Sequence, residues 1–339
     1  MIEKKTLAKE NLSRFLKKLQ ESGNRLIAPK KIGEKIDFSV VTSPDEIVDD
    51  YIQTVQSAKF AFFPKAEEIF RFTADKSGVN IKDKSPEKIQ PTVIFGLRPC
   101  DAAAVASLDA VFNWDYEDNL FNARREKIGI ISISCSKSDD DCFCTSLGFG
   151  PGDTRGSDIL LTKLTSGDYL AEIITDKGKE MMKAAADLFT SEPKEAKEKN
   201  LADVKAQFKP EDLARKFPAA FDKEAIWLEQ SLRCLGCGAC AFVCPVCACF
   251  DIQDEGTTQK GSRLRCWDAC GFSLFTLHTS GHNPREVQSH RWRQRLMHKF
   301  TYMQDRLKVL GCVGCGRCSR ACPVDINILE NVKTILEAK

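Results

Sequence analysis

The 339-residue sequence lacks any stretch approaching 18 consecutive apolar residues, so no segment is predicted to span a membrane. No apolar core follows the opening Met-Ile-Glu-Lys-Lys-Thr, so we expect no secretory signal and predict a cytoplasmic protein. The sequence also has almost no net charge, because 50 Lys and Arg residues are balanced by 48 Asp and Glu residues, which leaves a formal net charge of +2. This balance gives no overall field for nucleic acid or for a membrane surface.

The sequence also lacks the short motifs of common cofactor sites. It has no G-x-G-x-x-G fingerprint, no phosphate-binding P-loop and no H-E-x-x-H pair, and the glycine-rich segment 148–152 matches none of these. No nucleophile and base stand in a recognisable arrangement. We therefore predict no catalytic residue, and no flavin or nicotinamide site.

Cysteine, in contrast, is abundant, with 16 residues, and eight of them form a repeated pattern. Both copies read C-x2-C-x2-C-x3-C-P, the ligand run of two-cluster ferredoxins, in which the fourth cysteine of each run serves the other cluster. We therefore assign a first [4Fe–4S] cluster to Cys234, Cys237, Cys240 and Cys322. A second [4Fe–4S] cluster is assigned to Cys312, Cys315, Cys318 and Cys244.

The spacing of each run suits a cubane cluster. Two-residue spacers allow a tight turn to present three thiolates on one side, and the glycines between them let the backbone approach the cluster. Zinc is the weaker alternative, since closed zinc sites take four ligands and eight cysteines in this pattern fit two cubanes. Disulfides are not expected in a reducing compartment.

Four further cysteines lie in the N-terminal half: Cys100, Cys135, Cys142 and Cys144. Cys100 and Cys135 each follow an expected strand, and sites in α/β folds gather at the carboxyl ends of strands. A helix expected at 101–112 would point its positive end at Cys100, which suits an anionic cluster. We predict a third cluster here, with zinc or simple burial of the thiols as alternatives.

The last four cysteines follow the first run: Cys247, Cys249, Cys266 and Cys270. Their C-x-C and C-x3-C spacings could hold a fourth cluster, and packing beside the first cluster is the alternative. The spacer between the two runs is basic around 285–308, with seven Lys and Arg against Glu286 and Asp305. These cations either form a solvated helix face or compensate the charge of anionic clusters and partners.

The hydrophobic patterns predict an α/β domain at 1–186, a charged helical linker at 187–230 and an all-α two-cluster ferredoxin domain at 231–339. Strands are expected at 25–29, 36–41, 60–63, 92–97, 128–133, 159–162 and 169–174. Helices are expected at 4–20, 101–112, 223–232, 285–310 and 326–338.

Four motifs together resemble one protein family: Gly96-Leu-Arg-Pro-Cys-Asp101, Cys142-Phe-Cys144 with 148–152, Cys244-Pro-Val-Cys-Ala-Cys249, and the stretch from Arg265 to Cys270. The family comprises the A-type iron–sulfur component of anaerobic sulfite reductase and the beta subunit of soluble NAD(P)H-linked [NiFe] hydrogenases. Similar components accompany flavin oxidoreductase and heterodisulfide reductase complexes.

The resemblance implies a non-catalytic electron-transfer subunit of an anaerobic oxidoreductase. Such a subunit relays single electrons between an NAD(P)H-linked flavoprotein and a catalytic subunit of hydrogenase, sulfite reductase or heterodisulfide reductase type. Two alternatives remain open. One is a stand-alone iron–sulfur reductase with a substrate site in the N-terminal domain, and the other is a redox sensor or assembly scaffold.

Overall fold

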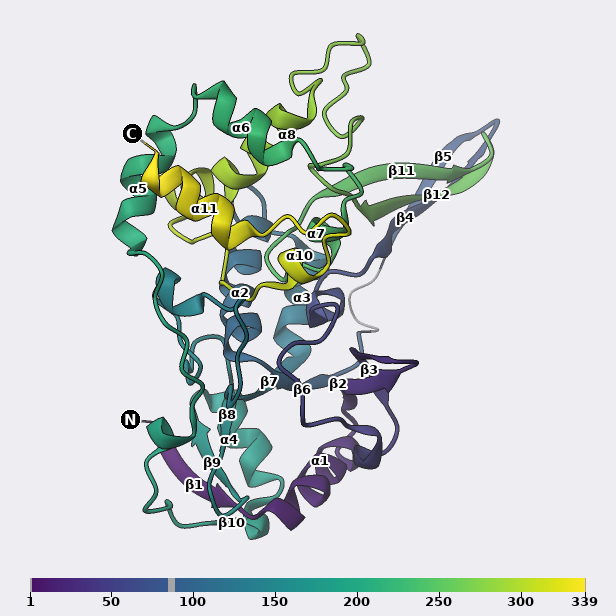
Figure 1. Cartoon of the computed structure of the whole chain (residues 1–339). Helices are drawn as coiled ribbons and strands as arrows, with labels where there is room; N and C mark the ends of the chain where they lie inside the picture. The colour runs from purple at the N-terminus through teal and green to yellow at the C-terminus, as the bar shows by residue number, and fades with distance from the viewer. Residues whose placement is uncertain (1, 85–88, 339) are drawn as a thin grey trace.

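An eight-stranded mixed sheet forms the base of the molecule in the computed structural model, which describes residues 2–84 and 89–338 (Figure 1). Its strands run in the order β10-β1-β9-β8-β7-β6-β2-β3. Their bounds are β1 Glu3–Leu7, β2 Arg25–Ile32, β3 Lys35–Val41, β6 Thr92–Leu97, β7 Ile128–Ile133, β8 Ile159–Lys163, β9 Tyr169–Ile173 and β10 Phe189–Thr190.

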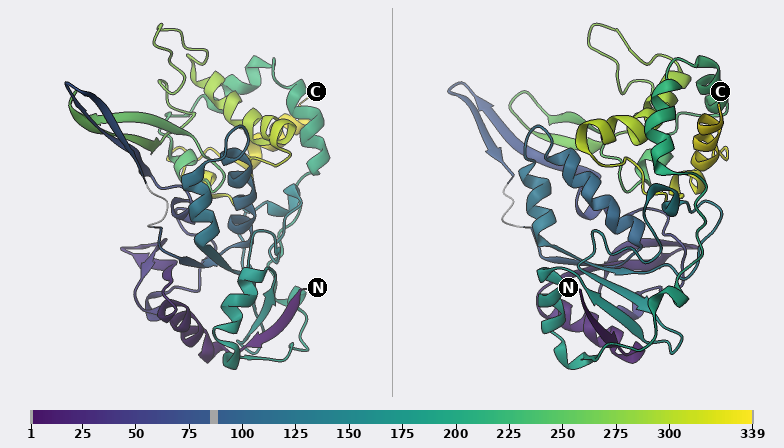
Figure 2. Two further views of the ribbon diagram at one scale, coloured as in Figure 1. Left: turned by 180° about the vertical axis from the view of Figure 1, so that it is seen from behind. Right: turned by 90° about the vertical axis from the view of Figure 1, so that its left-hand side faces the viewer.

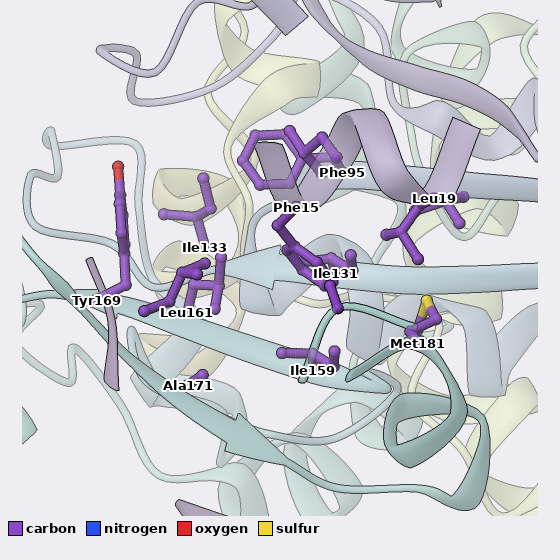
Figure 3. Close-up of a cluster of buried hydrophobic side chains, with 14 of the residues drawn as sticks. Phe15, Leu19, Phe95, Ile131, Ile133, Ile159, Leu161, Tyr169, Ala171 and Met181 are labelled. Atoms are coloured by element: carbon purple, nitrogen blue, oxygen red, sulfur yellow. The ribbon is translucent and has the colours of Figure 1, made fainter. Parts of the chain in front are cut away.

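The centre of this sheet is parallel and covered on both faces. Strands β2, β6, β7 and β8 pair in parallel, and every residue of β6 and β7 is buried. Continuous apolar runs of this kind are typical of parallel strands with helices on both sides. Helices α1 (Leu12–Glu21) and α4 (Asp176–Lys183) pack on one face, where Phe15, Leu19 and Met181 meet Phe95 and Ile131 (Figure 3).

The opposite face carries α2 (Pro99–Phe112) and α3 (Asn119–Lys127). Val105, Leu108 and Phe112 of α2 pack with Phe121 of α3 and with Ile130 of the sheet. The N-terminal half is therefore an α/β domain, as the sequence pattern predicts, and the structure arranges it in three layers.

Three predicted elements differ in the structure. The helix expected at 4–20 is a strand, β1, followed by α1, because Leu7 is buried in the sheet opposite Tyr169. The strand expected at 60–63 is a 3₁₀ turn, Ala58–Ala61, since a short apolar run can be buried in either conformation. The helix expected in the charged segment is largely irregular over 191–209, with one 3₁₀ turn at Lys197–Asn200.

A second sheet has four antiparallel strands in the order β11-β12-β4-β5, with β4 at Ala66–Asp75, β5 at Gly78–Asp83, β11 at Phe250–Gly256 and β12 at Lys260–Trp267. It projects from the body as an arm (Figures 1 and 2). Strand β12 pairs with β4, so the two halves of the chain share this sheet. The C-terminal half is consequently not all-α, which corrects our expectation for 231–339.

Buried charges hold the root of this arm. The Glu67 carboxylate on β4 is fully buried and accepts hydrogen bonds from Arg265 on β12, at 2.6 Å, and from Arg124 on α3. Arg265 also pairs with Asp118, which caps the N-terminus of α3. A paired and hydrogen-bonded charge can be buried at tolerable cost, so this network fixes the arm on the sheet.

The remaining helices pack above the sheet (Figure 1). They are α5 Pro210–Ala219, α6 Glu224–Ser231, α7 Ala239–Phe242, α8 Gln288–Met297, α9 Met303–Leu307, α10 Arg317–Arg320 and α11 Ile328–Glu337, with a π-helical turn at His298–Tyr302 joining α8 to α9. Phe217 of α5 and Trp227 of α6 are buried with Trp292 of α8 and Val332 of α11. The segment expected as a charged helical linker, 187–230, therefore contributes α5 and most of α6 to this core, and α6 agrees with the helix expected at 223–232.

Within residues 2–84 and 89–338, no helix is both long and apolar enough to cross a membrane.

Candidate metal centres

The first predicted ligand set gathers in one pocket. Thiols from both cysteine runs line it, namely Cys234, Cys237, Cys240, Cys318 and Cys322. Gly236 and Gly238 adopt left-handed backbone angles, with φ of 66° and 73°, and a Cβ atom on Gly238 would lie 2.5 Å from the Phe272 ring. Gln288 on α8 donates a hydrogen bond to the Cys234 sulfur at 3.1 Å.

The second predicted set lines a neighbouring pocket with Cys244, Cys312, Cys315 and Cys318. Its glycines, Gly314 and Gly316, have φ of 66° and 71°. These values nearly match those of Gly236 and Gly238, so the two cysteine runs adopt the same loop conformation. Lys299 from the π-helical turn is 3% exposed and donates to the Cys244 sulfur at 3.3 Å and to the Gly311 carbonyl at 2.8 Å. A buried ammonium group beside a thiolate ligand stabilises negative charge there.

The exchange of fourth ligands between runs agrees with this geometry. Cys322 of the second run lines the first pocket, and Cys244 of the first run lines the second pocket. Cys318 lines both pockets, so the two sites are direct neighbours. Short helices carry part of each set, with Cys240 in α7 and Cys318 in α10, and these helices contact each other.

The third predicted set also comes together. Cys100, Cys135, Cys142 and Cys144 line one pocket at the end of the large sheet, together with Cys315 of the second set. Cys100 lies in the first turn of α2 after β6, and Cys135 follows β7, the parallel neighbour of β6. The helix begins at Pro99, two residues earlier than predicted, with Arg98 as its N-cap.

The third site has its own polar partners. Gln53 donates to the Cys100 sulfur at 3.1 Å, and Arg320 of α10 donates to the Cys142 sulfur at 3.4 Å. Burial raises the pKa of Cys135 to about 11 and that of Cys144 to about 12. Thiols in such surroundings ionise at neutral pH only when a metal supplies positive charge, which an iron–sulfur cluster does.

The loop of the second run packs directly on the loop of the third site. The Phe143 N–H donates to the Gly314 carbonyl at 2.9 Å. A Cβ atom on Gly314 would lie 2.5 Å from the Cys144 nitrogen, so only glycine permits this approach. The second and third sites are therefore held together by backbone contact.

The fourth predicted set is only partly assembled. Cys247, Cys249 and Cys270 line a separate cavity, but Cys266 does not. Cys266 lies within β12 opposite Asp251 and Ala66, while its neighbour Trp267 is buried against Phe63 on the other face of the sheet. Side chains alternate along a strand, so Cys266 points away from that face, and its expected ligand role is not supported.

The first three sets pass a simple test of fit for [4Fe–4S] clusters. Their donors are thiols, which suit iron–sulfur clusters, and the loops of the first two sets pack so closely that a Cβ atom on Gly238 or Gly314 would collide with a neighbouring segment. No three His, Cys, Asp or Glu side chains in 2–84 and 89–338 converge tightly enough for a single metal ion. In each set the thiols line one pocket from separate segments, and a cubane takes four thiolates at separate corners.

The sequence did not identify the side chains around the thiols. Gln53, Gln288 and Arg320 contact cysteine sulfurs from distant segments, and none carries a local motif. Arg295 and Lys299 were expected only as members of a basic stretch. Arg295 and Lys299 are four residues apart, which places both on one face of a helix. This spacing is the sequence feature that distinguishes them from the other cations of the stretch.

The comparisons with known proteins agree with this interpretation of the site. A family model described as a 4Fe-4S dicluster domain matches residues 233–326. A relative, the sulfhydrogenase 2 subunit beta of Pyrococcus furiosus, is 32% identical over 341 aligned positions, covering 98% of this chain and 97% of the relative. No solved structure matches the chain.

The fold and the dicluster domain define an iron–sulfur electron-transfer protein. More narrowly, the chain belongs to the hydrogenase beta-subunit family.

Proposed function

We propose that this protein relays single electrons through three [4Fe–4S] clusters, bound by the first three cysteine sets. The clusters would supply reversible one-electron chemistry, because their charge is spread over several irons. The protein holds the clusters in order, hydrogen-bonds their ligands and shields them from water.

The observation that carries this proposal is the linear order of the three pockets. The first and second pockets share Cys318, and the second and third share Cys315. Sites that share a lining residue lie within one side chain of each other. Such a row is the arrangement an electron relay needs, whereas a sensor or a scaffold needs only one cluster.

The first site is the end of the row that a partner can approach. All sixteen cysteines lie in the described residues, and Cys237 alone among them is exposed. Leu228, Leu232 and Leu235, which precede it in the sequence, are 57%, 72% and 68% exposed. We propose that a subunit carrying its own redox centre docks here through an apolar surface, because electron exchange requires close approach to Cys237.

The proposal for the partner subunits rests on the redox chemistry of the clusters and on the name of the sulfhydrogenase relative. The relative's name makes it one subunit of a hydrogenase. We propose that this chain connects an NAD(P)H-linked flavoprotein subunit with a catalytic redox subunit of hydrogenase type. We place it in the cytoplasm, because sixteen unpaired cysteines require a reducing compartment.

Iron analysis of the anaerobically purified full chain tests the relay. The three cubanes of the relay account for about twelve of the irons in the chain. Cys142→Ser and Cys144→Ser should each remove about four irons and one set of EPR signals, since each breaks one four-thiolate set. An unchanged iron content in both variants would refute the third cluster.

A second measurement tests transfer along the row. Cys237→Ser should abolish reduction of the other clusters by a flavoprotein donor while far-UV circular dichroism stays unchanged. If the second and third clusters were still reduced at the original rate, the first site would not be the entry point and this part of the proposal would fail.

A further inference from the structure

The cavity lined by Cys247, Cys249 and Cys270 has a volume of about 580 Å³. It lies between the segment that follows the first cysteine run, the end of α2, and the continuous helix formed by α8, the π-helical turn and α9. This volume exceeds what a cluster alone requires, so the cavity has room for a small molecule beside the thiols.

The hairpin of β11 and β12 brings two of these thiols together. Cys249 directly precedes β11 and Cys270 follows β12, and the last pair of the hairpin is Phe250 with Trp267. The Asp268 N–H then donates to the Cys249 carbonyl at 3.0 Å, which continues the pairing beyond the strands. The root of the arm thus places Cys249 and Cys270 next to Cys247 on one wall of the cavity.

Among the residues that the structure describes, every charged side chain that lines this cavity is a cation: Arg285, Arg295, Lys299 and Arg306. Arg295 is 4% exposed, and its Nη2 donates to the Cys240 carbonyl at 3.0 Å, while Nη1 lies 3.9 Å from the Cys247 sulfur. Its buried Nε atom has no hydrogen-bond partner in the part of the chain that the structure describes. Lys59 is also buried, and its ammonium group donates a hydrogen bond to the Cys247 carbonyl at 2.7 Å.

These buried cations need an anion. Lys299 contacts the Cys244 sulfur of the second site and Arg295 also lines the first pocket, but neither Lys59 nor Arg295 forms an ion pair with a carboxylate of the described residues. An uncompensated buried charge costs several kcal/mol, so a stable fold needs negative charge close by. Three thiolates bound to a metal cluster provide that charge, and three free thiols do not.

We propose that Cys247, Cys249 and Cys270 bind a fourth iron–sulfur cluster through three thiolates, with its remaining iron open to the cavity. A small thiolate anion is the ligand class that this iron would take, because iron of such clusters favours sulfur and the facing side chains are cationic. Cys266, although part of the same sequence motif, is not a ligand. The proposal does not depend on the relay function, since it concerns the binding of iron and of one exogenous ligand.

Iron content tests the three ligands, with Cys266 as a matched control. In the anaerobically purified full chain, Cys249→Ser and Cys270→Ser should each lose about four irons relative to wild type, while Cys266→Ser should lose none. The EPR signals of the other clusters report whether the variants remain folded. Loss of iron in Cys266→Ser, or no loss in Cys249→Ser and Cys270→Ser, would overturn the assignment.

The open iron has its own chemical test. Ferricyanide would take one electron from the fourth cluster, which then releases its open iron as Fe²⁺ and leaves a three-iron cluster with its own EPR signal. This signal should appear in wild type and Cys266→Ser and be absent from Cys270→Ser. Its absence from wild type, or its presence in Cys270→Ser, would rule out an open iron at this site.

The ligand class is tested with mercaptoacetate as the probe. Its thiolate can bind the iron while its carboxylate meets Arg285 and Arg306, so it should change the EPR spectrum of the fourth cluster at lower concentration than uncharged mercaptoethanol. Arg285→Gln with Arg306→Gln should remove that preference at unchanged iron content. Equal effects of the two thiols in wild type would contradict the proposed role of the cations.

Discussion

Arg317 and Asp101 form an ion pair in which both side chains are 2% exposed. The Arg317 Nη2 atom lies 2.7 Å from the Asp101 Oδ2 atom, and Arg317 also donates to the Thr54 carbonyl at 3.0 Å. Asp101 directly follows Cys100 of the third site, and Arg317 lies between Cys315 and Cys318 of the second site. The pair therefore joins two ligand-bearing segments that are 216 residues apart.

Removing one partner of this pair should strongly destabilise the protein. Arg317→Met leaves the Asp101 carboxylate buried without compensation, which costs about 3–5 kcal/mol. We expect a clearly lower midpoint of thermal unfolding in anaerobic holoprotein. Arg215→Met, which breaks a surface pair with Asp212 on α5, should cost less than about 1 kcal/mol. Equal effects of the two variants would show that burial does not matter here.

Lys299 should raise the reduction potential of the second cluster. Reduction adds negative charge, which the Lys299 ammonium beside the Cys244 sulfur stabilises. A hydrogen bond to a charged group contributes about 1.5–3 kcal/mol, and about 59 mV corresponds to a tenfold change in a one-electron equilibrium, so Lys299→Met should lower the potential by roughly 60–130 mV. Potentiometric titration followed by EPR measures this shift.

The control for Lys299 is a lysine on the same chain segment. Lys308→Met removes an exposed ammonium group that donates to the Asp305 carbonyl at the end of α9. It should leave the potential of the second cluster within the error of the titration. A similar drop in both variants would assign the effect to overall charge and not to the contact with Cys244.

Gly314→Ala should separate the second and third sites. The new Cβ atom would lie 2.5 Å from the Cys144 nitrogen, at a φ of +66°. The left-handed conformation alone costs an L-residue about 1–2 kcal/mol, and the collision adds to that cost. Gly23→Ala is the matched control, because Gly23 also has a positive φ, +91°, but no atom of the described residues lies within 4 Å of the added Cβ.

We expect Gly23→Ala to lower the unfolding midpoint by the conformational cost alone. Gly314→Ala should lower it further and should also reduce the iron content, because the loops of two sites must part. Full retention of iron in Gly314→Ala would contradict the tight backbone packing between Gly314 and Cys144.

Glu46 should make stability depend on pH in the acid range. The hydrogen bond from Lys30, followed by those from Ser43 and Thr42, lowers the pKa of Glu46 from 4.5 to about 2. Its stabilising effect is therefore complete above pH 4.5 and is lost as the pH falls towards 2. The difference in unfolding midpoint between wild type and Glu46→Gln should narrow over this range, whereas a constant difference would refute the linkage.

The sequence pattern predicted the central strands well, because β6, β7 and β8 are continuous apolar runs that only a doubly covered sheet accommodates. It missed the arm. Every residue of β5 and of β11 is exposed, and the apolar alternations of Val79 with Ile81 and of Phe250 with Ile252 are too short to predict a strand. Their pairing comes from backbone hydrogen bonds between distant segments, which no local pattern records.

The sequence by itself determined the chemistry of the first two sites, because eight cysteines with fixed short spacings and adjacent glycines leave little freedom in how each loop folds. It also indicated where Cys100 and Cys135 lie, at the ends of adjacent parallel strands. Only the tertiary structure decided the order of the sites, through Cys318 and Cys315, which line neighbouring pockets.

The tertiary structure also decided that Cys266 stands apart from Cys247, Cys249 and Cys270. Spacing within a segment is set by local backbone geometry, whereas the face of a strand and the contacts between distant loops depend on packing across the whole chain.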